Sequence, residues 1–357
     1  MSREPQQVSA VSPTDIPVIF NTCEPRDDVV EGELAEEKFA ADLGQVVYGD
    51  DNSIYGSAQE FFGKTYPTDG LEKVLGNLTD QIADRSGSSV IDLDTSFGGG
   101  KTHNLIAAYH FLTDPEAIAE PERFVDSADY EGYLETLADR SVEVAAFVGT
   151  DVDALDASMA PEDTRLTNPN TIWGELAYRL EGASGYDEIR EYDEKRIAPG
   201  KNSFGKVLDE DRHYVILLDE LAEYLAKAQG VDADAEDGLD EGDVDDLADS
   251  TLAFFKALLQ YASTNDNLTV LYTIADTAFG DEAEAIRTTV EELGAIGKRK
   301  EWNITPTNDD EIAPVIANRL FASVDQEAAD TVASAYDEKF FSTPDSPVSG
   351  GDGDGDY

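Results

Sequence analysis

The sequence predicts an α/β fold in which helices flank a parallel β-sheet. One observation is a short β-prone run, residues 89–93, that leads through a glycine-rich turn into a helical run beginning at Lys101. The other is the strongly apolar run at residues 214–218, which is typical of a central strand buried on both faces and which ends in Asp219 and Glu220. Strand, turn and helix in this order form the repeating unit of parallel sheets.

The composition points to a very acidic protein with an ordinary core. The chain has 357 residues, enough for one large domain with an appendage or for two domains, and 41% of them are hydrophobic. Its net charge is −52, so its acidic side chains would repel one another strongly in dilute buffer. In molar salt the Debye length falls to roughly 3 Å, which screens most of this repulsion. The acid is spread along the whole chain. We therefore expect a cytoplasmic protein of an extreme halophile rather than an acidic mimic of nucleic acid.

Cysteine and apolar patterning exclude several classes of protein. Cys23 is the only cysteine, so an intrachain disulfide is excluded and a reducing interior is indicated. No apolar run approaches about 18 residues and no basic-then-apolar leader is present, so we predict neither a membrane span nor a signal peptide. Three histidines and one cysteine cannot build a zinc site of the usual spacing.

The glycine-rich turn has the residue types of the phosphate-binding loop (P-loop) of nucleoside triphosphatases. Gly98, Gly99 and Gly100 allow backbone N–H groups to curl around a phosphate, and the helix that follows adds its N-terminal partial charge. Lys101 would reach the β- and γ-phosphates, and the Thr102 hydroxyl would ligate Mg²⁺. This turn predicts a P-loop NTPase fold that binds phosphate.

Three residues near these glycines, Thr95, Phe97 and His103, also bear on the match to the motif. The full pattern has glycine six positions before the lysine, where this chain has Thr95, but three glycines still precede the lysine. Phe97 and His103 belong to the candidate nucleotide-binding set. His103, just inside the helix, is more often structural than catalytic.

Before the turn, the chain reads as an arm followed by helices. Residues 1–28 are polar and proline-rich, which favours an extended arm, and residues 32–43 form a weak amphipathic helix. Apolar residues at helical spacing predict a helix over 71–82, with Thr68 or Asp69 as its N-cap.

After the turn, residues 142–148 predict the next strand, residues 172–180 form a helical stripe, and residues 183–202 read as irregular. Polar groups at the carboxyl end of a strand lie where α/β sheets bind ligands. Strand 142–148 is followed by such a group: Gly149, Thr150 and Asp151.

The second half contains a further strand over residues 268–274, with predicted helices around it. Residues 232–249 are almost all Asp, Glu, Gly and Ala. This run departs from the calcium-loop pattern, because its glycine falls one place late and no glutamate closes the loop, so we predict a solvated disordered loop. The helices predicted in this half cover residues 221–228, 252–261, 283–293, 309–322 and 326–341.

We therefore expect four parts along the chain. They are an N-terminal arm and lead-in (1–69), a P-loop core (70–302), a partial C-terminal helical lid (303–342) and a disordered acidic tail (343–357).

Asp219 and Glu220 form the second nucleotide signature. Asp219 would hold Mg²⁺, and Glu220 would polarise the attacking water, which argues for hydrolysis rather than a GTPase-type switch. The insertions between the two motifs suit the AAA-like and RecA-like branch, with an extra strand between the phosphate-loop strand and the Asp-Glu strand. In that arrangement we expect strand 268–274 on the other side of the phosphate loop, with Thr273 or Asp276 as a γ-phosphate sensor. Threonine is also a common strand residue.

Arg299, between two lysines, stands in the only run of three bases. It could supply an arginine to a neighbouring subunit's phosphate or act as a sensor in cis. The run could also contact nucleic acid, or pair with the acidic helix before it. Arg319 is a second candidate.

Five segments together resemble a prokaryotic family of AAA-like ATPases still designated a domain of unknown function. They cover roughly residues 25–325, and the combination is specific. The segments are 37–43, 61–68, 97–103 (Phe97-Gly98-Gly99-Gly100-Lys101-Thr102-His103), 171–177 and 217–225.

The resemblance implies ATP as the nucleotide and an anti-phage defence complex as the setting, with a DNA methyltransferase or helicase as partner. Members are usually longer, so a truncated or split gene is expected, and a homo-oligomer and weak or indirect contact with DNA stay open. We expect a Mg²⁺-dependent ATPase that couples turnover to a DNA-modifying or restricting partner. The alternative is a nucleotide-binding switch or scaffold that has lost turnover.

Overall fold

The structure is a computed structural model in which the described residues fall into two compact units. One unit comprises residues 1–35 and 313–357, and the other comprises residues 36–312. The four-part division expected from the sequence stays a prediction. The described residues are 23–30, 41–49, 55–83, 87–93, 100–119, 121, 124, 130–138, 140–159, 169–229, 231, 246–274, 280–296 and 301–340.

The smaller unit joins the two ends of the chain. Strand β1 (Cys23–Pro25) pairs antiparallel with β7 (Phe321–Val324), so the arm expected over residues 1–28 contains a short strand and a helical turn. Arg26 Nε donates to the Asn318 carbonyl at 2.9 Å. The helices of this unit are α1 (Asp27–Val30), α14 (Ile312–Leu320) and α15 (Gln326–Phe340).

The larger unit is built on a parallel five-stranded sheet in the order β3-β4-β5-β2-β6. Every strand therefore points its carboxyl end to the same edge. The strands are β2 (Val90–Leu93), β3 (Val142–Val148), β4 (His213–Asp219), β5 (Leu268–Thr273) and β6 (Glu301–Ile304).

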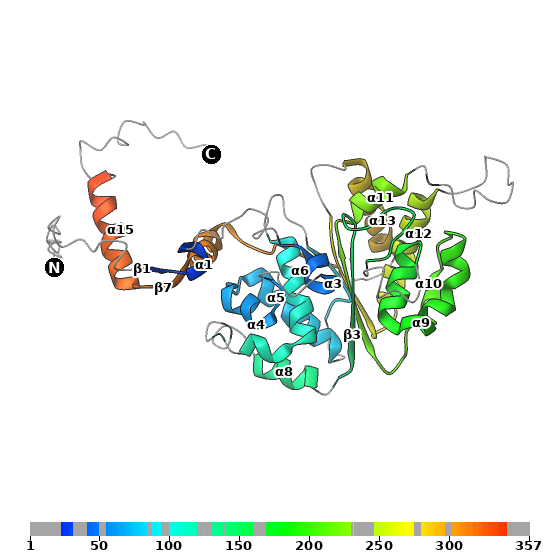
Figure 1. Cartoon of the computed structure of the whole chain (residues 1–357), viewed down its shortest axis with the longest axis horizontal. Helices are drawn as coiled ribbons and strands as arrows, with labels where there is room; N and C mark the ends of the chain where they lie inside the picture. The colour runs from blue at the N-terminus through cyan, green and yellow to red at the C-terminus, as the bar shows by residue number, and fades with distance from the viewer. Residues whose placement is uncertain are drawn as a thin grey trace, which may run out of the picture. The chain divides into compact units, whose positions relative to one another are not determined.

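Helices cover both faces of this sheet, which confirms the α/β class (Figure 1). One face carries α3 (Leu43–Tyr48), α4 (Ala58–Lys64), α5 (Asp69–Ile82), α6 (Lys101–Thr113), the 3₁₀ helix η2 (Pro115–Ala119) and α8 (Tyr130–Ala138). The other face carries α9 (Ile172–Glu194), α10 (Lys201–Phe204), α11 (Leu221–Ala228), α12 (Leu247–Ala262) and α13 (Gly280–Ile296). Among the described residues, no helix is long and apolar enough to cross a membrane.

The central strand β4 is buried along its whole length, as its apolar sequence predicts. Tyr214, Ile216 and Leu218 pack into the core under α9–α13, whereas Val215 and Leu217 pack into the core under α3–α8. The period-2 alternation of a strand thus divides one apolar run between two cores.

The strand order corrects one expectation. Strand β5 lies between β2 and β4, where it pairs with both, and not on the side of β2 that faces away from β4. In the sheet, β5 is therefore itself the extra strand between β2, which precedes the glycine-rich turn, and β4, which ends in Asp219. Its carboxyl end therefore adjoins the ends of both β2 and β4.

Two further elements differ from the sequence prediction. Strand β6 was not predicted, and it forms by pairing with the free edge of β2. Residues 183–194, expected to be irregular, continue α9 beyond a kink at Gly182, where φ is +62°. The side chains of Tyr186 and Ile189 are buried and pack this part of the helix against the core.

Helix α5 confirms the capping prediction. Its N-cap is Thr68, whose hydroxyl accepts the backbone N–H of Leu71 at 3.2 Å. The same hydroxyl donates to the Pro306 carbonyl at 2.6 Å, in the segment that follows β6. A 3₁₀ turn, η4 (Asp309–Glu311), continues that segment, and Glu311 accepts the backbone N–H of Asp69 at 2.7 Å.

Candidate functional site

Four residues predicted from separate motifs lie together at the carboxyl edge of the sheet. β2 leads towards α6, which begins with Lys101 and Thr102, while β4 ends in Asp219 and β5 ends in Thr273. These three strands are adjacent in the sheet. The strand order therefore brings the residues together although more than a hundred positions separate the first from the last.

The start of α6 has the geometry that its glycine predicts. Gly100 is the N-cap with φ +81°, a backbone conformation that glycine adopts without a steric penalty. Lys101 begins the helix, and its Nζ donates to the Ile274 carbonyl at 2.8 Å, just beyond β5. The lysine is therefore directed across the edge of the sheet towards the ends of β5 and β4.

Asp219 is the centre of the site and is only 3% exposed. Its Oδ1 accepts from the Thr273 hydroxyl at 2.5 Å, and the Thr102 hydroxyl lies beside its carboxylate. Burial raises the pKa of Asp219, while these two hydroxyls and the charge of Lys101 act in the opposite direction. The carboxylate is thus buried but held by donors from both neighbouring elements.

Glu220 has a strained backbone. Its φ of +52° and ψ of +40° place a non-glycine residue in the left-handed region, which costs about 1–3 kcal/mol. Its N–H donates to the Thr273 hydroxyl at 3.2 Å. Burial and the neighbouring Asp219 raise the pKa of the Glu220 carboxyl, and a hydrogen bond from the Thr150 hydroxyl lowers it. Strain of this kind clusters at functional sites, which supports the choice of Glu220.

Thr273 connects the two acidic residues. Its hydroxyl donates to Asp219 and accepts from the backbone of Glu220, so it orients both. The γ-phosphate sensor role expected for Thr273 stays a prediction, and the observed contacts assign it a positioning role.

Substituting Thr273 tests this connection. Thr273→Val keeps the shape but removes the donor to a buried carboxylate, so we expect the free energy of unfolding to fall by about 1–3 kcal/mol. Thr269→Val is the matched control, because Thr269 is buried on the same strand and its hydroxyl bonds to His213 at 2.9 Å. Both variants should lose stability in urea unfolding in molar KCl, but only Thr273→Val should weaken Mg²⁺-dependent nucleotide binding. Equal binding in both would contradict the role of Thr273.

His103 has structural contacts. Its ring lies 4.6 Å from the Phe61 ring centroid, and its Nε2 is 3.1 Å from the Thr65 hydroxyl. That hydroxyl donates to the Phe61 carbonyl at 2.8 Å, so Nε2 is the protonated nitrogen that donates to it. Burial lowers the pKa of His103 to about 4.

His103 should make the fold sensitive to acid. Its pKa is about 4 in the folded chain and 6.5 ordinarily, so the unfolded chain takes up the proton first. The stability from neutral His103 is complete above pH 6.5 and is lost as the pH falls towards 4. In this window His103→Gln should reduce the slope of unfolding free energy against pH by up to about 1.4 kcal/mol per unit. Urea unfolding across a pH series measures it, and equal slopes would contradict the burial of neutral His103.

The turn after β3 approaches the site closely. A Cβ on Gly149 would lie 2.2 Å from the Glu220 carbonyl oxygen, so this contact requires glycine. The Gly149 N–H donates to the Asp219 carbonyl at 2.9 Å. The sequence marked residues 149–151 as a polar strand end but assigned them no role, because their nearness to Glu220 depends on the pairing of β3 with β4.

Some predicted residues lie outside the described part of the chain. They are Thr95, Phe97, Gly98, Gly99, Asp276, Arg299 with its two flanking lysines, residues 1–22, most of the acidic loop (232–245) and the tail. Arg319, described in α14, belongs to the smaller unit.

The described donors suit Mg²⁺ held jointly with a phosphate ligand. No group of three metal-binding His, Cys, Asp or Glu side chains occurs among the residues that the structure describes. Mg²⁺ is commonly bound by one or two carboxylates together with substrate phosphates and water. One buried carboxylate, Asp219, with the Thr102 hydroxyl beside it fits this pattern.

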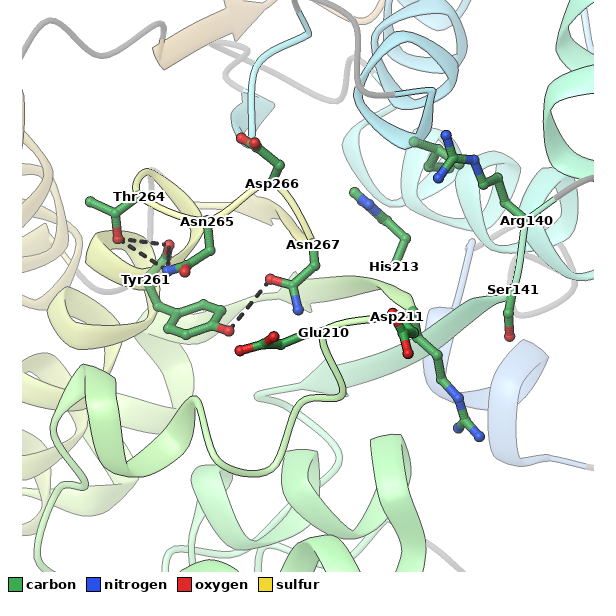
Figure 2. Close-up of a pocket in the computed structure, with 12 residues that line it drawn as sticks. Arg140, Ser141, Glu210, Asp211, His213, Tyr261, Thr264, Asn265, Asp266 and Asn267 are labelled. Carbon is green, nitrogen blue, oxygen red and sulfur yellow. Dashed lines mark hydrogen bonds between the residues drawn. The ribbon is translucent and has the colours of Figure 1, made fainter.

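A pocket of about 380 Å³ lies at the opposite, amino edge of the sheet (Figure 2). Arg140, His213, Tyr261 and Asn267 are among its lining residues, and Tyr261 donates to Asn267 at 3.4 Å. None of the site residues predicted from the sequence lines it. This pocket therefore has no part in the predicted chemistry.

Comparison with known proteins identifies the family to which the chain belongs. No curated protein matches the sequence. The DUF499 N-terminal domain matches residues 18–292, which include every strand of the central sheet except β6. The chain therefore belongs to the DUF499 family.

Proposed function

We propose that this protein binds and hydrolyses ATP with Mg²⁺ at the carboxyl edge of the central sheet, as an AAA-like P-loop NTPase. The observation that carries the proposal is the placement of Lys101 and Thr102, at the start of α6, beside the buried Asp219 carboxylate at the end of β4: Lys101 Nζ donates to the Ile274 carbonyl just beyond the adjoining β5. A hydroxyl at a helix start beside an aspartate at a strand end is the arrangement that holds Mg²⁺ in P-loop NTPases. The sheet order supports it, because a strand lies between those that lead to the two motifs.

Each described residue has a role in the proposed reaction. Lys101 binds the β- and γ-phosphate oxygens, for which it leaves the Ile274 carbonyl, and the N-terminus of α6 adds its partial positive charge. Thr102 and Asp219 hold the metal ion, which when bound would neutralise charge on the phosphates. Glu220 orients and polarises the attacking water. Thr273 orients Asp219 and Glu220 through the two hydrogen bonds of its hydroxyl.

The proposed setting is a DNA-modification or phage-defence complex in the cytoplasm of a halophile. Its support is the sequence resemblance described above, together with the net charge of −52. ATP as the nucleotide has the same support. Arg299 remains the proposed arginine for a neighbouring subunit or a sensor in cis.

Equilibrium nucleotide binding in molar KCl tests the proposal. We expect ATP to bind tightly with Mg²⁺ and less tightly with EDTA, because Thr102 and Asp219 act through the metal. Phosphate release then separates the ATPase from the switch or scaffold. Binding without release would favour the scaffold, and the absence of Mg²⁺-dependent binding would reject both.

A further inference from the structure

Lys227, on α11, has an ammonium group that contacts four oxygen atoms near the site. Its Nζ donates to three backbone carbonyls of one turn, at 3.0 Å to Gly149, 2.8 Å to Thr150 and 3.2 Å to Val152. It also forms an ion pair with Glu223 at 3.2 Å. An ammonium group has three N–H donors, and three of the four oxygen atoms around it are carbonyls of this turn.

This turn is the one that approaches Glu220. It follows β3, and its Gly149 lies so close to Glu220 that a Cβ there would be 2.2 Å from the Glu220 carbonyl oxygen. At its start, the Gly149 N–H donates to the Asp219 carbonyl. Lys227 lies two helical turns after Glu220 on the helix that Glu220 begins. The turn is therefore bound at two points to the β4–α11 segment that carries both acidic residues.

We propose that Lys227 is a positioning residue for Glu220, which acts by holding the turn at residues 149–152 against α11. The inference rests on the proposed ATPase function, whose glutamate it concerns. Without the ammonium group, three carbonyls would lose their shared donor. The turn would then keep only its backbone contacts, and Gly149 would be held less firmly against the backbone of Asp219 and Glu220.

The chemistry favours a positioning role over a surface ion pair. Exposed ion pairs contribute little, and Glu223 can satisfy only one side of the ammonium group. Three carbonyl acceptors at 2.8–3.2 Å define a location in a way that a single carboxylate does not. Lys195 provides the contrast, because its ammonium bonds to Glu191 one turn earlier on the exposed surface of α9.

Two measurements on Lys227→Ala, with Lys195→Ala as matched control, test the proposal. The first is hydrogen exchange without nucleotide, in the peptide that contains residues 149–152. We expect faster exchange in Lys227→Ala and no change in Lys195→Ala. The second is turnover at saturating ATP, with ATP affinity measured separately. We expect turnover to fall about 10- to 100-fold with affinity nearly unchanged, because the misplaced group acts on the reacting water.

Chemical rescue sharpens the test. Ammonium chloride, exchanged for choline chloride at constant ionic strength, should restore part of the turnover of Lys227→Ala by supplying N–H donors to the vacated carbonyls. It should have no such effect on Lys195→Ala. If Lys227→Ala does not fold, Lys227→Met keeps the apolar stem and replaces it in the exchange and turnover measurements.

Each outcome bears on the inference. Unchanged exchange at residues 149–152 would overturn it, and so would faster exchange with parental turnover. An inactive parent protein would overturn the proposed ATPase and this role with it, and faster exchange in Lys227→Ala would then show that the contact itself is real. Faster exchange, reduced turnover and ammonium rescue together would support the inference.

Discussion

Glu220→Gln is expected to lower ATP turnover by about 10²-fold or more while ATP stays bound. The substitution keeps the size of the side chain and its capacity for hydrogen bonding, but it removes the charge that polarises the attacking water. That charge acts mainly in the transition state, so its loss lowers the rate more than the affinity. Single-turnover hydrolysis and equilibrium ATP binding, both in molar KCl, separate the two quantities.

Two comparisons make this result specific. Glu191→Gln removes a carboxylate from the exposed surface of α9 and should leave turnover unchanged. Asp219→Asn should reduce both Mg²⁺-dependent binding and turnover, because Asp219 serves the metal in the ground state as well. If Glu220→Gln hydrolyses ATP at the parental rate, Glu220 is not the base, and the binding-only alternative gains support.

Lys101→Ala is expected to weaken ATP binding by about 10- to 100-fold. A hydrogen bond to a charged group contributes about 1.5–3 kcal/mol, and each 1.4 kcal/mol is a factor of ten in affinity. Alanine is the best helix former, so α6 should still begin at this position. Fluorescence titration with a labelled ATP analogue measures the change.

Lys195→Ala is the matched control for this substitution also, because it removes an exposed ammonium group that pairs with Glu191. Both variants make the net charge more negative by the same amount, so a general electrostatic effect would appear in both. Undiminished affinity in Lys101→Ala would reject the phosphate-binding role of α6.

Much of the fold could be predicted because its signals are local. The continuous apolar run of β4 and the apolar spacing in α5 each lie within one element, and both predictions were confirmed. Strand order is not local. The sequence of β5 does not state that it pairs with β2 and β4, and its position was predicted wrongly.

The missed elements depend on tertiary contacts. β6 has only four residues of mixed polarity, and its strand geometry comes from pairing with β2. The second half of α9 looks polar, but its Asp193 is fully buried and accepts hydrogen bonds from Thr171, at the beginning of the same helix, and from Tyr186. A buried aspartate in that role cannot be told from a surface aspartate in the sequence.

The candidate site divides in the same way. Lys101, Thr102, Asp219 and Glu220 could be chosen from residue type and spacing, since phosphate and Mg²⁺ restrict which groups can bind them. The residues that orient these four could not be predicted, because their contacts depend on which strands lie next to each other. The Thr273 hydroxyl reaches Asp219 only because β5 adjoins β4, and Lys227 meets the turn at residues 149–152 only because β3 pairs on the other side of β4.

The most direct test of the central claim is single-turnover hydrolysis of γ-phosphate-labelled ATP by the full chain in excess, in molar KCl, with Mg²⁺ or EDTA. The account predicts release of labelled phosphate with Mg²⁺ by the parent protein, and none above background with EDTA. It predicts that Glu220→Gln retains bound, uncleaved ATP. Equal release by the parent protein and Glu220→Gln, or no binding of ATP by either, would contradict it.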